Sequence, residues 1–289
     1  MASPGGRDRV LIKSCVIGWP ISHSRSPLIH GYWLKQLGID GSYTRQPVEP
    51  SALAGFIRGL SDAGYAGCNV TLPHKEDAFR LILPADASTE RLGAVNTIYL
   101  RDGRVFGTNT DGEGFINSLM DSQPGLSLKN SRAVVLGAGG ASIAIVNVLL
   151  EQGVSEVAIA NRTRAKAQLL RDQFGSRVMP VDWDTAADHL SECSLLVNTT
   201  SLGMKGQADL VIDLSRLPID AVVTDIVYTP LRTKLLMDAA QRGHGVVEGL
   251  GMLLHQAVRG FSLWFGEIPR VNPDLYDLVA RDIDPAYAR

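Results

Sequence analysis

The chain has 289 residues, of which 45% are hydrophobic and 20% are charged, a composition that can bury one large core or two modest ones. Its formal net charge is −2 and it has no long basic or acidic run, so neither a nucleic acid nor a membrane surface is indicated as a partner. Any anion that the protein binds must therefore be held by a local cluster of side chains.

Cysteine and histidine usage indicates neither a disulfide framework nor a metal site. Cys15, Cys68 and Cys193 lie far apart, and the six histidines show no metal-ligand spacing. The first eight residues or so are expected to be irregular and contain no apolar targeting segment, and no apolar run approaches the length of a membrane span. These features predict a cytoplasmic protein with no bound metal.

The first third of the chain alternates strand-like and helix-like segments. Strands are predicted over residues 10–18, 41–49 and 65–72, and a helix is predicted over residues 26–38, closing on Gly38. A second helix is predicted over residues 51–64 with Ser51 as N-cap, and a third begins with Pro73 in its first position. Strands separated by helices of this length predict a mainly parallel sheet.

A second series of strands and helices begins near residue 131. It contains a strand, a glycine turn and a helix over 131–153, a helix over 164–174, and further strands within 156–163, 194–204, 220–228 and 244–249. Helical segments follow over 230–243, 252–266 and 272–283. We predict two α/β domains with a cleft between them: an open, mainly parallel substrate-binding domain over 1–111 plus 246–289, and a Rossmann-type nucleotide domain over 112–245.

The glycine turn "VVLGAGGAS" follows an apolar strand and precedes a helix. Gly137 would allow the tight turn and Gly139 a close approach to a pyrophosphate, while the helix N-terminus supplies N–H groups. The third position of the fingerprint is Ser142, which is small but is not glycine. A turn that only packs the helix on the sheet is the alternative interpretation.

The segment after the next strand favours NADP over NAD. An NAD site carries an acidic residue about 20 residues after the glycine turn. Here that position reads Asn161, Arg162, Thr163 and then Lys166, with no carboxylate. Cations in this place can pair with a 2′-phosphate, although a solvated helix face would have the same composition.

Lys75, in "NVTLPHKEDAF", is unusual because it lies at a predicted helix start, where the helix dipole disfavours a cation. Other strand ends and helix starts in this half are also polar, namely Ser24 and Ser26, Asn69 and Thr71, Asn96, and Asp111. Taken singly, each has a structural explanation as a cap or a turn residue.

Taken together, these stretches resemble a known family. The motifs "GWPISHSRSPLIH", "NVTLPHK", "GAVNT", "NTDG", "GAGGA", "NRT", "NTTSLGM", "DIVYTPLRTKLL" and "GLGMLLHQA" occur in this order. The chain is similar, from about residue 15 to about residue 265, to the shikimate dehydrogenases, NADP-linked enzymes of chorismate and aromatic amino acid biosynthesis that reduce 3-dehydroshikimate to shikimate.

The resemblance implies roles for individual residues. Ser24 and Ser26 would bind the substrate carboxylate, and the ring hydroxyls would be held by Asn69, Thr71, Asn96, Asp111, Tyr228 and Gln256. Lys75 and Asp111 would be the catalytic pair. The NADP site would comprise Gly137, Ala138, Gly139, Gly140, Ala141, Asn161, Arg162, Thr163, Lys166, Thr199, Met204, Ile226, Gly249 and Met252. Lys166 departs from the arginine common in the family, and an ammonium group cannot clamp a phosphate bidentately.

A mechanism follows for Lys75. Reduction of a ring ketone by hydride places negative charge on its oxygen, and a general acid must supply a proton there. We expect Lys75 to donate it while Asp111 orients the lysine and the substrate. The alternatives are a quinate/shikimate dehydrogenase that uses NAD, a relative acting on an amino-substituted analogue, and an NADP-binding sensor that has lost catalysis. The sequence is equally consistent with a monomer and a homodimer.

Overall fold

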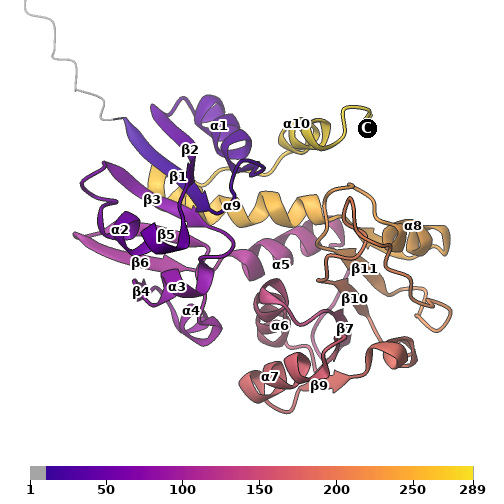
Figure 1. Ribbon diagram of the computed structural model, residues 1–289. Helices are drawn as coiled ribbons and strands as arrows, with labels where there is room; N and C mark the ends of the chain where they lie inside the picture. Colours follow the sequence, from indigo (N-terminus) through magenta and orange to yellow (C-terminus); the bar gives the residue numbers. More distant parts are fainter. Residues whose placement is uncertain (1–10, 289) are drawn as a thin grey trace, which may run out of the picture. The chain divides into compact units, whose positions relative to one another are not determined.

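The computed structural model describes residues 11–288 (Figure 1), so the expected irregular start of the chain lies outside the described residues. These residues divide into two compact units. Unit 1 contains the residues up to Thr110 and Ala257–Leu275, and unit 2 contains Asp111–Gln256 and the residues from Tyr276 on.

Unit 1 is built on a six-stranded sheet of order β2-β1-β3-β5-β6-β4. Its elements are β1 (Ile12–Gly18), α1 (Ser26–Leu37), β2 (Gly41–Pro47), η1 (Pro50–Ala52), α2 (Leu53–Arg58), β3 (Tyr65–Val70), α3 (Lys75–Phe79), β4 (Leu83–Pro84), α4 (Ala87–Leu92), β5 (Thr97–Arg101) and β6 (Arg104–Thr108). The strand β1 is parallel to β2 and β3, as predicted, and Gly38, with φ 63°, caps the C-terminus of α1.

The β5–β6 hairpin was not predicted and adds antiparallel pairs to this sheet. Its two-residue turn, Asp102-Gly103, has positive φ at both positions, 51° and 69°. Such a turn matches the twist of the flanking strands, and Asp-Gly is one of the sequences that favour it. The signal was therefore present in the sequence.

Two helices of unit 1 differ from their predicted bounds. The predicted helix 51–64 is reduced to α2, because a 3₁₀ turn at Pro50–Ala52 precedes it and Gly59 follows it; its N-cap is Ala52 rather than Ser51. The helix predicted to begin at Pro73 begins at Lys75, after a turn in which the His74 N–H bonds the Thr71 carbonyl. Lys75 is thus the first residue of a five-residue helix.

Unit 2 is built on a wholly parallel sheet of order β12-β11-β10-β7-β8-β9. Its elements are α5 (Asp111–Ser122), β7 (Arg132–Leu136), α6 (Gly140–Glu151), β8 (Glu156–Ala160), α7 (Arg164–Phe174), β9 (Val178–Val181), η2 (Trp183–Leu190), β10 (Leu195–Asn198), β11 (Val222–Asp225), α8 (Lys234–Gln241) and β12 (Gly245–Val247). The last helices, α9 (Gly249–Phe265) and α10 (Pro273–Ile283), each contain a boundary between the units.

Side-chain alternation along the strands gives this sheet two buried faces. In β7, Ala133 and Val135 pack on one face with residues of α5, α6 and α7, whereas Val134 and Leu136 pack on the other with η2 and α8. A parallel sheet covered by helices on both faces has strands that are apolar over most of their length, as Ala133–Leu136 of β7 are. Of the helices described between residues 11 and 288, none is long and apolar enough to cross a bilayer.

An imidazole lies in the aromatic core of unit 1. His30 stacks on Tyr43 with ring centroids 4.0 Å apart, and the rings of Trp33, Phe261 and Trp264 lie within 5.9 Å. Neither of its ring nitrogens has a hydrogen-bond partner among the described residues. Burial lowers the pKa of His30 to about 3, and the nearby Asn69 side chain only partly opposes this shift.

The buried imidazole predicts a dependence of stability on pH. Because the folded-state pKa lies below the unfolded value, the unfolded chain binds a proton first, so stability falls as the pH drops from about 6.5 toward 3. The slope from this group is at most about 1.4 kcal/mol per pH unit. When the free energy of unfolding is measured in urea between pH 7 and 4.5, its dependence on pH should be weaker for His30→Phe than for the wild type.

The exposed His23 provides the matched control, and His23→Phe should keep the wild-type slope. An unchanged slope in His30→Phe would contradict the prediction.

Candidate active site

The carboxyl ends of four strands of unit 2 lie in register. Leu136, the last residue of β7, pairs with Ala160 of β8 and with Asn198 of β10, and Asn198 pairs with Asp225 of β11. The loops that leave these strands therefore start from one edge of the sheet. Ligands of open α/β sheets bind at such an edge.

The glycine turn after β7 contains one glycine that the backbone conformation requires and two that leave the backbone open to a ligand. Gly137 has φ 107°, and a Cβ there would lie 2.7 Å from Thr199 Oγ1. Gly139 caps α6 and Gly140 begins it, and a Cβ on either would meet nothing within 4 Å. The backbone at the N-terminus of α6 is thus open to a ligand, which suits a pyrophosphate. Thr199 supports the turn by donating to the Leu136 carbonyl at 2.8 Å.

The segment after β8 is tied to this turn. The Ala138 N–H donates to Asn161 Oδ1 at 3.1 Å, and Asn161 Nδ2 donates to the Thr163 carbonyl at 2.9 Å. Arg162 and Lys166 are exposed and make no ion pair within the described part of the chain, unlike Arg164, which pairs with Asp182 at 2.5 Å. Exposed cations in the segment after β8 fit a phosphate on the ligand.

Gly249 occupies a tight place at the start of α9. A Cβ there would lie 2.6 Å from the carbonyl group of Ile226 and from the Val227 oxygen. The close approach gives this predicted cofactor residue a packing role of its own. Ile226 and Met252 both pack against the core beneath α5 and α6, whereas Met204 is exposed.

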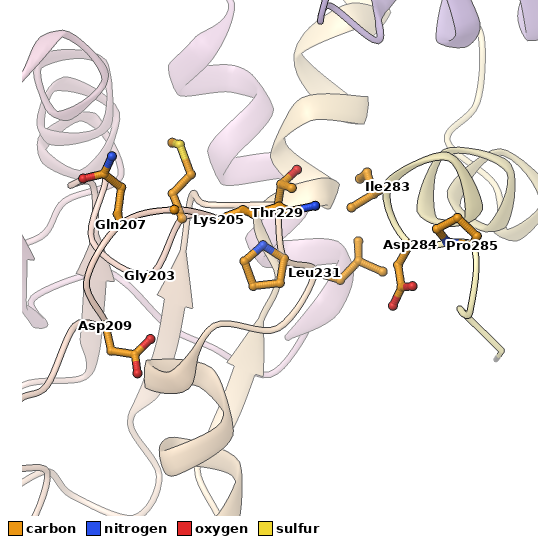
Figure 2. A pocket seen from close by; sticks show the side chains of 12 residues that line it. Gly203, Lys205, Gln207, Asp209, Thr229, Leu231, Ile283, Asp284 and Pro285 are labelled. Atoms are coloured by element: carbon orange, nitrogen blue, oxygen red, sulfur yellow. The ribbon is translucent and has the colours of Figure 1, made fainter.

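A cavity of about 480 Å³ lies beside two of these loops. Figure 2 shows Gly203, Lys205, Gln207 and Asp209 on one side, Ile283, Asp284 and Pro285 on the other, and Thr229 and Leu231 between them. Met204 is the one predicted cofactor residue in its lining. The cavity therefore borders the predicted nucleotide site and does not contain most of it.

The two serines of unit 1 lie at the start of α1. Ser24 and Ser26 place their hydroxyl oxygens 3.3 Å apart, and the Ser26 N–H donates to Ser24 Oγ at 3.3 Å. Arg45, on β2, donates through Nε to the Ser24 carbonyl at 2.8 Å and so fixes this loop. Sequence reasoning missed Arg45, because nothing in the strand pattern links it to the serines. Paired hydroxyls of this kind can bind a carboxylate.

The asparagines of unit 1 belong to one hydrogen-bond network. Asn69 Oδ1 accepts from the Tyr43 hydroxyl at 2.5 Å, and Asn69 Nδ2 donates to the Asn96 carbonyl at 3.0 Å and to Thr97 Oγ1 at 3.1 Å. Asn96 Oδ1 accepts from the Thr110 N–H at 2.9 Å. The network brings together predicted residues that are 27 positions apart, and it adds Tyr43, which was not predicted.

The remaining predicted residues start or follow regular elements. In unit 1, Thr71 follows β3 and Lys75 begins α3; in unit 2, Asp111 begins α5 and Tyr228 lies in the loop after β11. Gln256, on α9, donates to the Leu253 carbonyl at 3.0 Å. Among residues 11–288 no group of three His, Cys, Asp or Glu side chains could hold a metal ion.

The parallel sheet of unit 2, its glycine turn and the open N-terminus of α6 define the class: an α/β protein with a Rossmann-type dinucleotide-binding unit. Comparison with known proteins identifies the family. Family models described as the shikimate dehydrogenase substrate binding domain, shikimate / quinate 5-dehydrogenase and the shikimate 5′-dehydrogenase C-terminal domain match residues 16–98, 119–205 and 249–273.

The chain is 54% identical to shikimate dehydrogenase (NADP(+)) of Rhodopseudomonas palustris strain TIE-1, over 94% of this chain and 97% of that one. A solved shikimate 5-dehydrogenase of Thermus thermophilus, in complex with NADP(H) and shikimate, is 36% identical with a TM-score of 0.82, over 94% and 100% of the two chains. Quinate dehydrogenase of Corynebacterium glutamicum, in complex with NAD, is 29% identical with a TM-score of 0.86, over 93% and 98%. The chain belongs to the shikimate dehydrogenase family, as its motifs predicted.

Two glycines of the turn should respond differently to substitution. Gly137→Ala forces a Cβ into a left-handed conformation beside Thr199, and we expect it to lose about 1–3 kcal/mol of stability. Gly139→Ala has room for its Cβ and should keep the wild-type stability, yet it should weaken dinucleotide binding because the methyl group faces the open side of the turn. Chemical unfolding and fluorescence titration with NADP⁺ measure the two effects. Wild-type affinity in Gly139→Ala would remove this turn from the binding site.

Proposed function

We propose that the protein catalyses the reversible, NADPH-dependent reduction of 3-dehydroshikimate to shikimate. The observation that carries the proposal is the 54% identity, over nearly the whole of both chains, to an enzyme named for shikimate and NADP⁺. The geometry of each unit supports it, because unit 2 has an open glycine turn and unit 1 groups the hydroxyl and amide side chains that a polyhydroxylated acid needs.

Unit 2 is the proposed NADP-binding part. The turn from Gly137 to Ala141 would hold the pyrophosphate, and the 2′-phosphate would pair with Arg162 and Lys166, which stand where an NAD site has a carboxylate. Asn161 would fix the segment through its bond to the Ala138 N–H. The bound cofactor supplies the hydride. The remaining proposed contacts are Thr163, Thr199, Met204, Ile226, Gly249 and Met252.

Unit 1 is the proposed substrate-binding part, and the family model that matches residues 16–98 carries that description. Ser24 and Ser26 would donate to the carboxylate. Both amide hydrogens of Asn69 are used within the protein, and Oδ1 accepts one bond, so a substrate hydroxyl could bind Asn69 only by donating to its remaining lone pair. The other proposed contacts are Thr71 and Asn96, which belong to unit 1, and Asp111, Tyr228 and Gln256, which belong to unit 2.

Lys75 and Asp111 are the proposed catalytic pair. As hydride adds to the carbonyl carbon, the Lys75 ammonium would transfer a proton to the carbonyl oxygen, and the reverse reaction would return that proton to the amine. Asp111 would orient the ammonium group and bind a substrate hydroxyl. Retention of both residues disfavours a sensor that has lost catalysis.

A quinate-using, NAD-linked enzyme is the second candidate, because the quinate dehydrogenase complex with NAD has a TM-score of 0.86 to this chain. Steady-state rates with shikimate and with quinate, each with NADP⁺ and NAD⁺, separate the two. We expect turnover of shikimate with NADP⁺ and at least about a tenfold lower kcat/KM for the other combinations, since a site built on specific polar contacts discriminates strongly. Comparable rates with quinate and NAD⁺ would favour the second candidate.

The same assay tests the cofactor residues. The double variant Arg162→Ala/Lys166→Ala should raise the KM for NADP⁺ by about 10²-fold or more and leave that for NAD⁺ nearly unchanged, because only NADP⁺ carries the 2′-phosphate. Arg164→Ala is the control, since Arg164 already pairs with Asp182. An equal change for both cofactors would exclude a 2′-phosphate contact.

Substitution of the proposed acid should affect turnover more than binding. Lys75→Ala should lower kcat by at least about 10²-fold with KM little changed, whereas Asp111→Asn should alter both parameters. The exposed Lys35→Ala, on α1, is the charge-matched control and should keep wild-type rates. A Lys75→Ala enzyme with normal kcat would remove Lys75 from the mechanism.

A further inference from the structure

Two buried polar residues end neighbouring strands of unit 2. Asn198 is the last residue of β10 and Asp225 is the last of β11; they pair across the sheet, and both are 0% exposed. Asn198 Nδ2 donates to Asp225 Oδ1 at 2.9 Å. No cationic side chain between residues 11 and 288 pairs with Asp225, which is unusual because burial disfavours the charge of a carboxylate. Its position therefore requires an explanation.

Each of the two side chains holds the loop that follows its own strand. Asn198 Oδ1 accepts from the Thr200 N–H at 2.9 Å and from Thr200 Oγ1 at 2.7 Å. Asp225 Oδ1 accepts from the Val227 N–H at 2.9 Å, and Asp225 Oδ2 accepts from Thr233 Oγ1 at 2.7 Å. Asn198 Nδ2 also donates to the Leu202 carbonyl at 3.2 Å. The bond between Asn198 and Asp225 joins these two sets, so residues 199–202 and 226–233 share one hydrogen-bond network.

Further contacts connect the same loops farther from the sheet. The Lys205 N–H donates to the Thr229 carbonyl at 2.8 Å, and a Cβ on Gly203 would lie 3.3 Å from Thr233. Both loops line the cavity of Figure 2. They also carry four residues of the proposed site, namely Thr199, Met204, Ile226 and Tyr228.

We propose that Asp225 is a positioning residue. It holds Ile226, a proposed cofactor contact, and Tyr228, a proposed substrate contact, in place relative to the loop after β10. This inference rests on the proposed function for the roles of those two side chains. Asp225 is fully buried and acts through them, without touching a ligand itself.

The chemistry of the network says what can replace the carboxylate. Three donors converge on Asp225: the Asn198 amide, the Val227 N–H and the Thr233 hydroxyl. Burial raises the pKa of Asp225 although all three bonds oppose that shift. In Asp225→Asn, the amide oxygen could still accept from the Asn198 amide and the Val227 N–H. The amide nitrogen could donate to Thr233 Oγ1 once the threonine hydroxyl has rotated. A leucine would leave all three donors unpaired.

The experiment compares Asp225→Asn, Asp225→Leu and Thr233→Val with the wild-type chain. Valine has nearly the shape of threonine, so Thr233→Val removes one donor with little change in side-chain volume. It costs no helix cap, because the Thr233 hydroxyl does not bond to α8. Val178→Ala, in the buried part of β9 at the far edge of the sheet, is a control for general destabilisation.

Hydrogen exchange is the first readout, because it needs no substrate. We expect at least tenfold faster exchange in residues 199–209 and 226–233 of Asp225→Leu, a smaller increase confined to 226–233 in Thr233→Val, and wild-type exchange there in Asp225→Asn and Val178→Ala. Wild-type exchange of both loops in Thr233→Val and Asp225→Leu would overturn the proposal. If Asp225→Leu does not fold, the Thr233→Val result decides.

Kinetics is the second readout. Thr233→Val should raise the KM for shikimate several-fold while the Kd for 2′,5′-ADP stays at the wild-type value. Asp225→Asn should keep the wild-type value of both constants. An Asp225→Asn enzyme as impaired as Asp225→Leu would show that the charge itself is needed and would overturn a positioning role. A wild-type enzyme that does not turn over shikimate would contradict the proposed function, and the exchange data would still test the network.

Discussion

The register of the parallel sheet in unit 2 is the constraint on which its candidate site depends. Because β7, β8, β10 and β11 end level with one another, the glycine turn, the Asn161 segment and two loops all leave from the same edge. A one-residue shift in the register of β10 against β11 would turn the apolar side chains of the shifted strand to the opposite face of the sheet. It would also separate Asn198 from Asp225. The pairing that buries the core thus also assembles the polar network above it.

The sequence predicted what depends on local pattern. The helix expected over residues 164–174 is α7 with the same bounds, and the glycine turn, its strand and its helix lie where the motif placed them. The family was evident from nine short motifs. The predicted helix 51–64 was wrong in length, since periodicity alone does not reveal that Pro50 starts a 3₁₀ turn and Gly59 ends α2.

What the sequence could not reveal depends on contacts between distant segments. Tyr43 and Arg45 lie on a strand whose pattern is unremarkable, yet they bond to Asn69 and to the Ser24 loop. Asp225 reads as an ordinary strand end, and only the register of β10 and β11 shows that it joins two loops. Motifs identify residue types at a site, whereas the partners that hold them are set by packing.

The aromatic core around His30 also gives the protein an optical property. Trp33 and Trp264 are buried in unit 1, with ring centroids 5.7 and 5.5 Å from the imidazole, whereas Trp183, on η2, packs against the core of unit 2. Tryptophan emission responds to the polarity around the indole, so these residues report on different cores. Variants retaining only Trp33 or only Trp183 would follow the melting of each unit separately within one unlabelled chain.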